Sequence, residues 1–404
     1  MVNKNGLTMV KGFKYAGINA GGDSNKKNIG LVYSTVEETY GVAVYTKSDV
    51  KAAPVIISMN NDKATTKKRA VLINSGNANA FTGKRGFCDA ENCVSEVSKL
   101  LGIKQDEVYI GSTGIIGRKL EADNILSGIG KAVEELEEGE NKAIDFIEAI
   151  MTTDTKVKQA SISFEIGGKT INIASCVKGA GMIMPNMATM LCLITTDANI
   201  TPDMMSKALK ESVEHTFNCI TIDGDTSTND SIFLLSNGIA RNTVIDSDGE
   251  DFKIFAKHLH ILMEHMAKEV VNDGEGVTKF ITIDIVNTPT KKQAKKIAFS
   301  IGNSPLVKTT FYGNQLNWGR LMMAVGKAQT GLNCEIVDVY INKYKVVEDG
   351  EPALSSEEFK KAEQSLTDRN IDILIDFKQG TEKIRIWTCD YSLDYIKINA
   401  NYIT

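Results

Sequence analysis

Short apolar runs recur along the chain and predict β-strands. Such runs occupy residues 41–45, 69–73, 281–286 and 337–341, and their length is typical of buried strands. Two further pairs of runs flank short Gly-containing turns, which predicts β-hairpins. One pair is 161–166 and 170–175 around Gly167-Gly168, and the other is 371–377 and 383–388 around Gln379-Gly380.

Other segments repeat apolar residues every three or four positions and predict helices. These are residues 120–136, 141–151 and 252–270, and we expect each apolar stripe to face the core. Thr201-Pro202 predicts another helix, with Thr201 as the N-cap and Pro202 in the first turn. A further helix is expected to begin near Ser355. The mixture of strands and helices predicts an α/β fold with sheets covered by helices.

Length and composition narrow the class of protein. At 404 residues the chain exceeds the size at which one hydrophobic core keeps growing, so we expect two packed domains. Apolar residues make up 42% and charged residues 24%, which is ordinary for a globular protein. The formal net charge of -5 gives no basic field that would attract nucleic acid or an anionic membrane.

Targeting and redox signals favour a cytoplasmic protein. The N-terminus has no continuous apolar region of the kind found in signal peptides. The longest apolar stretch, 182–194, is interrupted at Pro185-Asn186 and is too short to span a bilayer. The seven cysteines are scattered and never spaced as C-x-x-C, which favours reduced thiols and argues against a zinc site.

Several polar and Gly-rich strings stand out because folding alone does not demand them. They are NSGNANAFTG (74–83), GSTGIIG (111–117), MTTDT (151–155), KGAGMIMPNMATML (178–191), FNCITIDGDTSTND (217–230), DGEGVTK (273–279), NWGR (317–320) and NANYIT (399–404). GSTGIIG fits neither a phosphate loop nor a dinucleotide fingerprint, but the N–H groups of such a loop can form an oxyanion hole. The DGDTSTND part of the fifth string lacks the Gly and Glu that an EF-hand needs.

The best candidate nucleophile is a threonine. The four histidines show no HExxH spacing, and no Ser-His-Asp arrangement or GxSxG elbow suggests itself. Thr189 lies between the turn-forming Pro185-Asn186 and a buried-strand pattern. An internal Thr hydroxyl is a poor nucleophile without a base. Cleavage between Ala188 and Thr189 would give Thr189 a free α-amine with a reference pKa of about 7.7–8.0, which could act as that base.

In this order, the strings resemble the ornithine acetyltransferase family, also called glutamate N-acetyltransferase. The similarity runs from about Gly12 to Thr404, and the block KGAGMIMPNMATML is its most specific part. The resemblance implies self-cleavage after Ala188 into chains 1–188 and 189–404, with Thr189 as the nucleophile. Thr113 would supply a hydroxyl and Gly114 a backbone N–H to the oxyanion hole.

The resemblance also implies a substrate site and a reaction. The substrate-binding positions would be Thr152, Lys178, Thr189, Glu275, Asn399 and Thr404. Lys178 could pair with the α-carboxylate of a substrate, and Glu275 could meet the side-chain amine of ornithine. Acetyl would pass from N2-acetylornithine to Thr189 and then to glutamate, without a metal or nucleotide cofactor.

Three further properties follow from the resemblance. The fold would be an α/β type with sheets sandwiched by helices, as in enzymes with an N-terminal nucleophile. The cleaved protomers would pair as an α2β2 assembly. Acetyl-CoA is a possible second acetyl donor, and the sequence does not indicate whether it is used.

Two other functions stay open at this stage. A self-cleaving amidase or aminopeptidase would share the nucleophile but pass the acyl group to water. A binding protein that has lost activity is disfavoured, because Thr113, Gly114, Lys178 and Thr189 are all present. Departures from the family pattern are mild: residues 21–30 are more polar than expected, NQL precedes NWGR, and Phe81 replaces a common cysteine.

Overall fold

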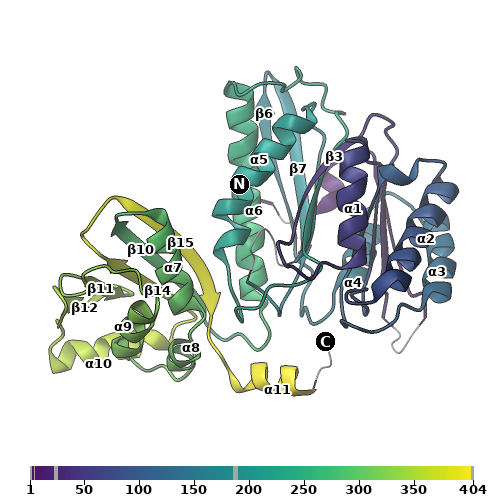
Figure 1. The fold of residues 1–404 in the computed structure, drawn as a ribbon. Coiled ribbons are helices and arrows are strands. Elements are labelled where there is room, and N and C mark those ends of the chain that lie inside the picture. The colour runs from purple at the N-terminus through teal and green to yellow at the C-terminus, as the bar shows by residue number, and fades with distance from the viewer. Residues whose placement is uncertain (1, 4, 22–25, 185–189, 402–404) are drawn as a thin grey trace.

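The computed structural model describes residues 2, 3, 5–21, 26–184 and 190–401. Within these residues the strands form three sheets, arranged in two lobes (Figure 1). The first sheet has the order β1 (Phe13–Ile18), β2 (Ile29–Ser34), β4 (Ala70–Asn74), β5 (Val108–Ser112). The second has the order β3 (Tyr40–Tyr45), β9 (Ser231–Ser236), β8 (Leu191–Thr196), β7 (Lys169–Lys178), β6 (Gln159–Ile166).

The first two sheets pack face to face in one lobe. Buried residues of both sheets, such as Tyr109 and Phe233, meet between them, and these two rings stack at 4.7 Å. The outer face of the first sheet is covered by α1 (Ala53–Ala64), α2 (Gly83–Leu101) and α3 (Ala122–Glu134). The outer face of the second is covered by α5 (Pro202–His215) and α6 (Glu250–Asn272) (Figure 1). The lobe is therefore a helix–sheet–sheet–helix sandwich, which confirms the expected fold class.

The third sheet forms the other lobe. Its order is β13 (Glu351–Pro352), β12 (Tyr344–Glu348), β11 (Asp338–Ile341), β14 (Asn370–Asp376), β10 (Phe280–Thr288), β15 (Glu382–Cys389). The lobe also contains α7 (Lys291–Gly302), α8 (Pro305–Tyr312), α9 (Trp318–Lys327) and α10 (Ser356–Gln364). Along β10, Ile281, Ile283 and Ile285 are buried, whereas the alternate residues face outward. One cluster of buried apolar residues continues from α5 and α6 into this lobe.

The two predicted hairpins have different outcomes. The first is confirmed, because β6 pairs with β7 and both turn residues have positive φ, 55° at Gly167 and 72° at Gly168. The second prediction is wrong. Although β14 and β15 occupy the predicted residues, β10 lies between them, parallel to β14 and antiparallel to β15. An alternating pattern defines a strand and its buried face, but it does not identify the neighbour that completes its hydrogen bonds.

The predicted helices are present, but the N-cap expected at Thr201 is not formed by its side chain. The segments 120–136, 141–151 and 252–270 correspond to α3, α4 (Glu140–Ile150) and α6. Pro202 opens α5, but the Thr201 hydroxyl does not cap it and instead donates to the Ile245 carbonyl at 3.4 Å. Ser355 forms a capping box with Glu358 at the start of α10.

The expected cleavage point does not separate the lobes. β7 ends at Lys178 and β8 begins at Leu191, and the two strands are antiparallel neighbours in the second sheet. Chains 1–188 and 189–404 would thus share this sheet. The lobes instead divide between the end of α6 at Asn272 and the start of β10 at Phe280. α11 (Leu393–Asn401) follows the last strand of the third sheet and lies beneath both lobes (Figure 1).

Packing between the first two sheets can be tested at Phe146. This α4 side chain is fully buried against β2, so Phe146→Ala should lower the free energy of unfolding by about 3–5 kcal/mol. Urea unfolding followed by circular dichroism would measure the loss. Phe359→Ala on α10 is the matched control, since Phe359 is 37% exposed. Equal losses for the two variants would contradict the packing described here.

Candidate active site

A cavity lies where the ends of two strands, two loops and a helix come together. It lies beside the ends of β5 and β7, the loop after α4, the loop after α6, and α11. Its volume of about 190 Å³ lies below the ~300–1,000 Å³ of pockets that hold drug-sized ligands, which favours a small metabolite. Its wall includes acidic, basic, hydroxyl and amide side chains: Thr113, Thr152, Lys178, Asp223, Asp225, Ser227, Asp230, Glu275 and Asn399.

The cavity brings together sequence positions that are far apart. Six of the residues expected from sequence line it: Thr113, Gly114, Thr152, Lys178, Glu275 and Asn399. Ala188, Thr189 and Thr404 lie outside the described residues. Met190, which directly follows Thr189 in the chain, is part of the cavity wall.

The loop after β5 requires glycine at position 114. Gly114 has φ of 126°, and a Cβ atom there would lie 2.4 Å from the backbone carbon of Gly76. The neighbouring Thr113 is fixed by its N–H, which donates to the Asn74 carbonyl at 2.9 Å. Two Gly-rich strings that are separate in the sequence, NSGNANAFTG and GSTGIIG, therefore form one closely packed wall.

Lys178 is held against two hydroxyl groups. Its Nζ donates to Thr113 Oγ1 at 2.9 Å and to Thr152 Oγ1 at 3.0 Å. The residue is 8% exposed. Burial lowers the pKa of its ammonium, and the negative charge of Asp154 opposes that effect.

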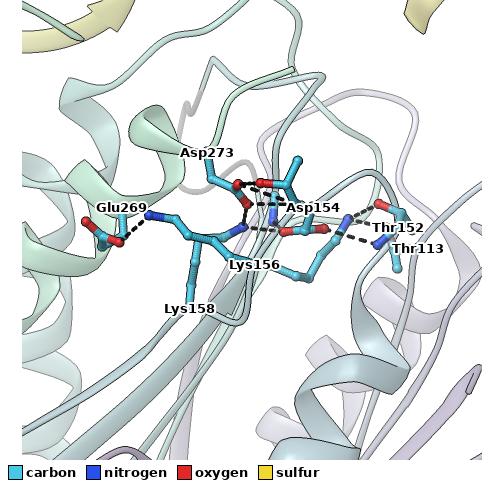
Figure 2. Close-up of polar contacts among 10 residues, drawn as sticks. Thr113, Thr152, Asp154, Lys156, Lys158, Glu269 and Asp273 are labelled. Atoms are coloured by element: carbon cyan, nitrogen blue, oxygen red, sulfur yellow. Dashed lines mark hydrogen bonds and ion pairs between the residues drawn. The ribbon is translucent and has the colours of Figure 1, made fainter. Parts of the chain in front are cut away.

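A network of buried charges that the sequence did not reveal joins Asp154, Lys158 and Asp273 (Figure 2). Asp154 Oδ1 accepts hydrogen bonds from Lys158 Nζ at 2.6 Å and from the Gly179 N–H at 2.7 Å. Its Oδ2 accepts from the Thr152 N–H at 3.1 Å. Lys158 also pairs with Asp273. MTTDT and DGEGVTK had indicated functional segments, but nothing in the sequence pointed to Lys158.

Glu275 and Asn399 meet in the cavity wall. Asn399 Nδ2 donates to Glu275 Oε2 at 2.8 Å, which joins α11 to the loop after α6. The Glu275 N–H donates to the Ala180 carbonyl at 2.9 Å. A Cβ atom at Gly181 would lie 2.6 Å from the Glu275 carboxyl, so a larger residue there would displace this carboxylate.

Asp223 fixes the backbone that leads toward the expected cleavage point. Its carboxylate accepts the N–H groups of Met182 and Ile183 at 2.6 and 2.8 Å. Met182 has φ of 56°, which is unusual for a residue with a side chain and carries strain. The segment DGDTSTND, which was compared with a calcium-binding loop, thus has a structural role through Asp223. Across the described residues, no group of three His, Cys, Asp or Glu side chains forms a metal site.

Asp230 is a second acidic residue that sequence analysis left without a role. It directly precedes β9, and its buried Oδ2 has no hydrogen-bond partner among the described residues. Burial raises the pKa of this carboxyl well above its usual range, and Lys178 opposes the shift. Asp230 thus lines the cavity as a carboxyl that holds its proton more tightly than usual.

Comparison with known proteins decides the family. A family model described as "ArgJ family" matches residues 14–404. The chain belongs to the ArgJ family. It is 41% identical to a glutamate N-acetyltransferase of Methanocaldococcus jannaschii over 99% of this chain and 98% of that protein. It is 39% identical to the arginine biosynthesis bifunctional protein ArgJ of Caldanaerobacter subterraneus, over 98% of each chain.

A solved ArgJ structure agrees with this assignment. The crystal structure of the Bacillus halodurans arginine biosynthesis bifunctional protein matches with a TM-score of 0.51 and 37% identity. The match covers 53% of this chain and 100% of that one. The expected resemblance and enzyme class, an acyltransferase of the ArgJ family, are confirmed. No helix in the described part of the chain has the length and apolar content needed to cross a bilayer.

The Asp154 network should make stability depend on pH in the acidic range. Burial raises the pKa of Asp154, but the charges of Lys178 and Lys158 outweigh it and lower the pKa to about 2 from 3.8. A carboxyl with a depressed folded-state pKa adds stability above its unfolded pKa and loses it as pH falls toward the folded value. The Asp154→Asn variant should therefore be less stable than wild type at neutral pH. The gap should shrink by about 2 kcal/mol between about pH 5 and pH 2.

Urea unfolding across this pH range would measure the gap. Asp49→Asn, at an exposed position, is the control for loss of one surface charge. A gap for Asp154→Asn that stays constant down to pH 2 would mean that the carboxylate is not stabilised by these two cations.

Proposed function

We propose that the chain transfers the acetyl group of N2-acetylornithine to glutamate through an acetyl-Thr189 ester. The observation that carries the proposal is the common cavity of Thr113, Gly114, Thr152, Lys178, Glu275 and Asn399. These residues come from five separate segments, and each has the chemistry expected from the family resemblance. The relative from M. jannaschii carries the name glutamate N-acetyltransferase, which supports glutamate as the acceptor.

The reaction has two half-steps. Thr189 Oγ attacks the acetyl carbonyl, its proton passes to the Thr189 α-amine, and the carbonyl electron pair moves to oxygen. The resulting oxyanion receives hydrogen bonds from the Thr113 hydroxyl and the Gly114 N–H. Collapse breaks the C–N bond, and the departing ornithine amine takes up the proton. The neutral amine of glutamate then attacks the ester, and N-acetylglutamate leaves as Thr189 regains its hydroxyl proton.

Self-cleavage between Ala188 and Thr189 supplies the free amine in this scheme. The two products would hold about 47% and 53% of the 404 residues. The B. halodurans chain, matched over its whole length, covers 53% of this one, which supports a cut at the equivalent place. The backbone before the cut is fixed by Asp223, and the backbone after it enters β8.

The two products would stay together after cleavage. Lys178 of β7 pairs with Leu191 of β8, and the antiparallel register continues to Ile173 and Thr196. β8 and β9 also pair, so the second sheet draws strands from both products. An α2β2 assembly would require a further interface between two such cleaved protomers, and we propose it on the family resemblance.

Replacing the nucleophile tests the proposal directly. Wild type should run as two fragments that meet between Ala188 and Thr189 in a denaturing mass measurement. Thr189→Ala should remain a single chain and should transfer no acetyl from acetylornithine to glutamate. Appearance of free acetate in place of N-acetylglutamate would identify an amidase. An uncut wild type that transfers acetyl would exclude the Thr189 α-amine as the base.

Recognition of the positively charged side chain of acetylornithine, the acetyl donor, can be tested at Glu275. Glu275→Gln retains an oxygen that can accept from Asn399 but removes the charge expected to meet the ornithine side-chain amine. The kcat/KM for acetylornithine should fall roughly 10- to 150-fold, since hydrogen bonds to charged groups contribute about 1.5–3 kcal/mol.

Glu269→Gln is the matched control for this experiment. It removes a carboxylate whose pair with Lys156 is at the surface, and such pairs contribute little. Steady-state kinetics on cleaved protein would compare the variants. An unchanged kcat/KM in Glu275→Gln would mean that this carboxylate does not recognise the donor.

A further inference from the structure

The position of Lys178 is unusual for a residue that only anchors a substrate carboxylate. Both partners of its Nζ in the described structure are neutral hydroxyls, those of Thr113 and Thr152. The ion pairs of this region join Asp154 and Asp273 to Lys158, one layer further from the cavity. A buried ammonium at the cavity wall is thus directed at the residue expected to stabilise the oxyanion.

The contact changes what the Thr113 hydroxyl can do. A hydroxyl carries one donor and two acceptor sites. Because Thr113 Oγ1 accepts a hydrogen bond from Lys178 at 2.9 Å, its own proton remains available for a group in the cavity. Hydrogen bonds in series polarise one another, and the effect is larger with a charged first donor in a low-dielectric site. The ammonium therefore makes Thr113 a stronger donor.

We propose that Lys178 is a positioning residue that stabilises the oxyanion through Thr113, and that Asp154 and Lys158 hold it in place. The inference rests on the proposed function and deepens it. No proton leaves Lys178 in either half-step. As the C–O bond to Thr189 forms and the carbonyl electron pair moves to oxygen, the negative charge faces the Thr113 hydroxyl, which is oriented by the ammonium behind it.

Asp154 fixes three parts of the site with one carboxylate. Its hydrogen bonds to the Gly179 N–H and the Thr152 N–H hold the residue after Lys178 and the second partner of Lys178. Its pair with Lys158 is fully covered, with both side chains 0% exposed. Removing one partner of such a pair leaves an uncompensated buried charge. The network thus locks Lys178 at the end of β7 and supplies the negative charge that favours its ammonium form.

The test measures acetyl exchange from acetylornithine to glutamate by Lys178→Met, Thr113→Val and the double variant. Rates are calculated for the concentration of cleaved protein, which is determined by mass measurement under denaturing conditions. Acting through Thr113, Lys178→Met should lower kcat at least tenfold, with KM for both substrates within about threefold of wild type. The double variant should be no slower than Thr113→Val. A KM increase at unchanged kcat, or losses that multiply in the double variant, would overturn the inference in favour of a carboxylate anchor.

Lys158→Met provides a second reading if Lys178→Met fails to fold or to cleave. Lys158 is absent from the cavity wall and cannot bind substrate directly. The Lys158→Met variant should nevertheless lower kcat and leave KM unchanged. A normal kcat in folded, cleaved Lys158→Met would refute the supporting role of the network. Lys156→Met is its matched control, because Lys156 pairs with Glu269 at the surface.

The two levels of proposal fail in different ways. If wild type transfers no acetyl to glutamate, or if Thr189→Ala still does, the proposed function fails before Lys178 is considered. If wild type is active and depends on Thr189, the kcat and KM pattern of Lys178→Met bears on the inference alone.

Discussion

The antiparallel pairing of β7 with β8 is the interaction on which the rest of the site depends. It brings Lys178, the last residue of β7, opposite Leu191, the first residue of β8. The parallel pairing of β8 with β9 places Ser231 beside Leu191, so Asp230, which precedes Ser231, lies at the same end of these strands. Backbone hydrogen bonds between buried strands are costly to break because the freed groups find no water. The proposed cut can therefore remove a covalent link without separating the residues that it leaves on either side.

Several buried charged side chains lie near this end of the strands. The partners of each one decide whether its charge is compensated. Lys158 has carboxylates on two sides, so its charge is compensated. Lys178 has hydroxyls instead, so its charge stays available to the cavity. Burial raises the pKa of Asp230, whose Oδ2 has no hydrogen-bond partner among the described residues. The surroundings therefore decide whether a buried charge is paired with carboxylates, as at Lys158, or lies against neutral hydroxyls, as at Lys178.

Sequence reasoning identified the segments of the site better than their connections. Apolar periodicity is a local signal, and it located most strands and helices. The Gly-rich and polar strings carried the family resemblance, and that resemblance implied Thr113, Thr152, Lys178, Glu275 and Asn399. The insertion of β10 between β14 and β15 is non-local, so the turn at Gln379-Gly380 was misleading. Lys158 follows MTTDT by three residues and resembles any surface lysine in sequence. Its importance appears only when folding places Asp154 and Asp273 against it.

The contact between Asn399 and Glu275 has a consequence for how the molecule can be divided. α11 belongs in sequence to the lobe built on the third sheet, but its Asn399 completes a wall of the cavity in the other lobe. The third sheet also contributes the Trp387 carbonyl, which accepts the Thr221 N–H at 3.0 Å. Neither lobe alone contains the complete wall of the cavity. Recombination between relatives at the lobe boundary would separate halves of one binding site, so the chain is expected to evolve as a single unit despite its two-lobed shape.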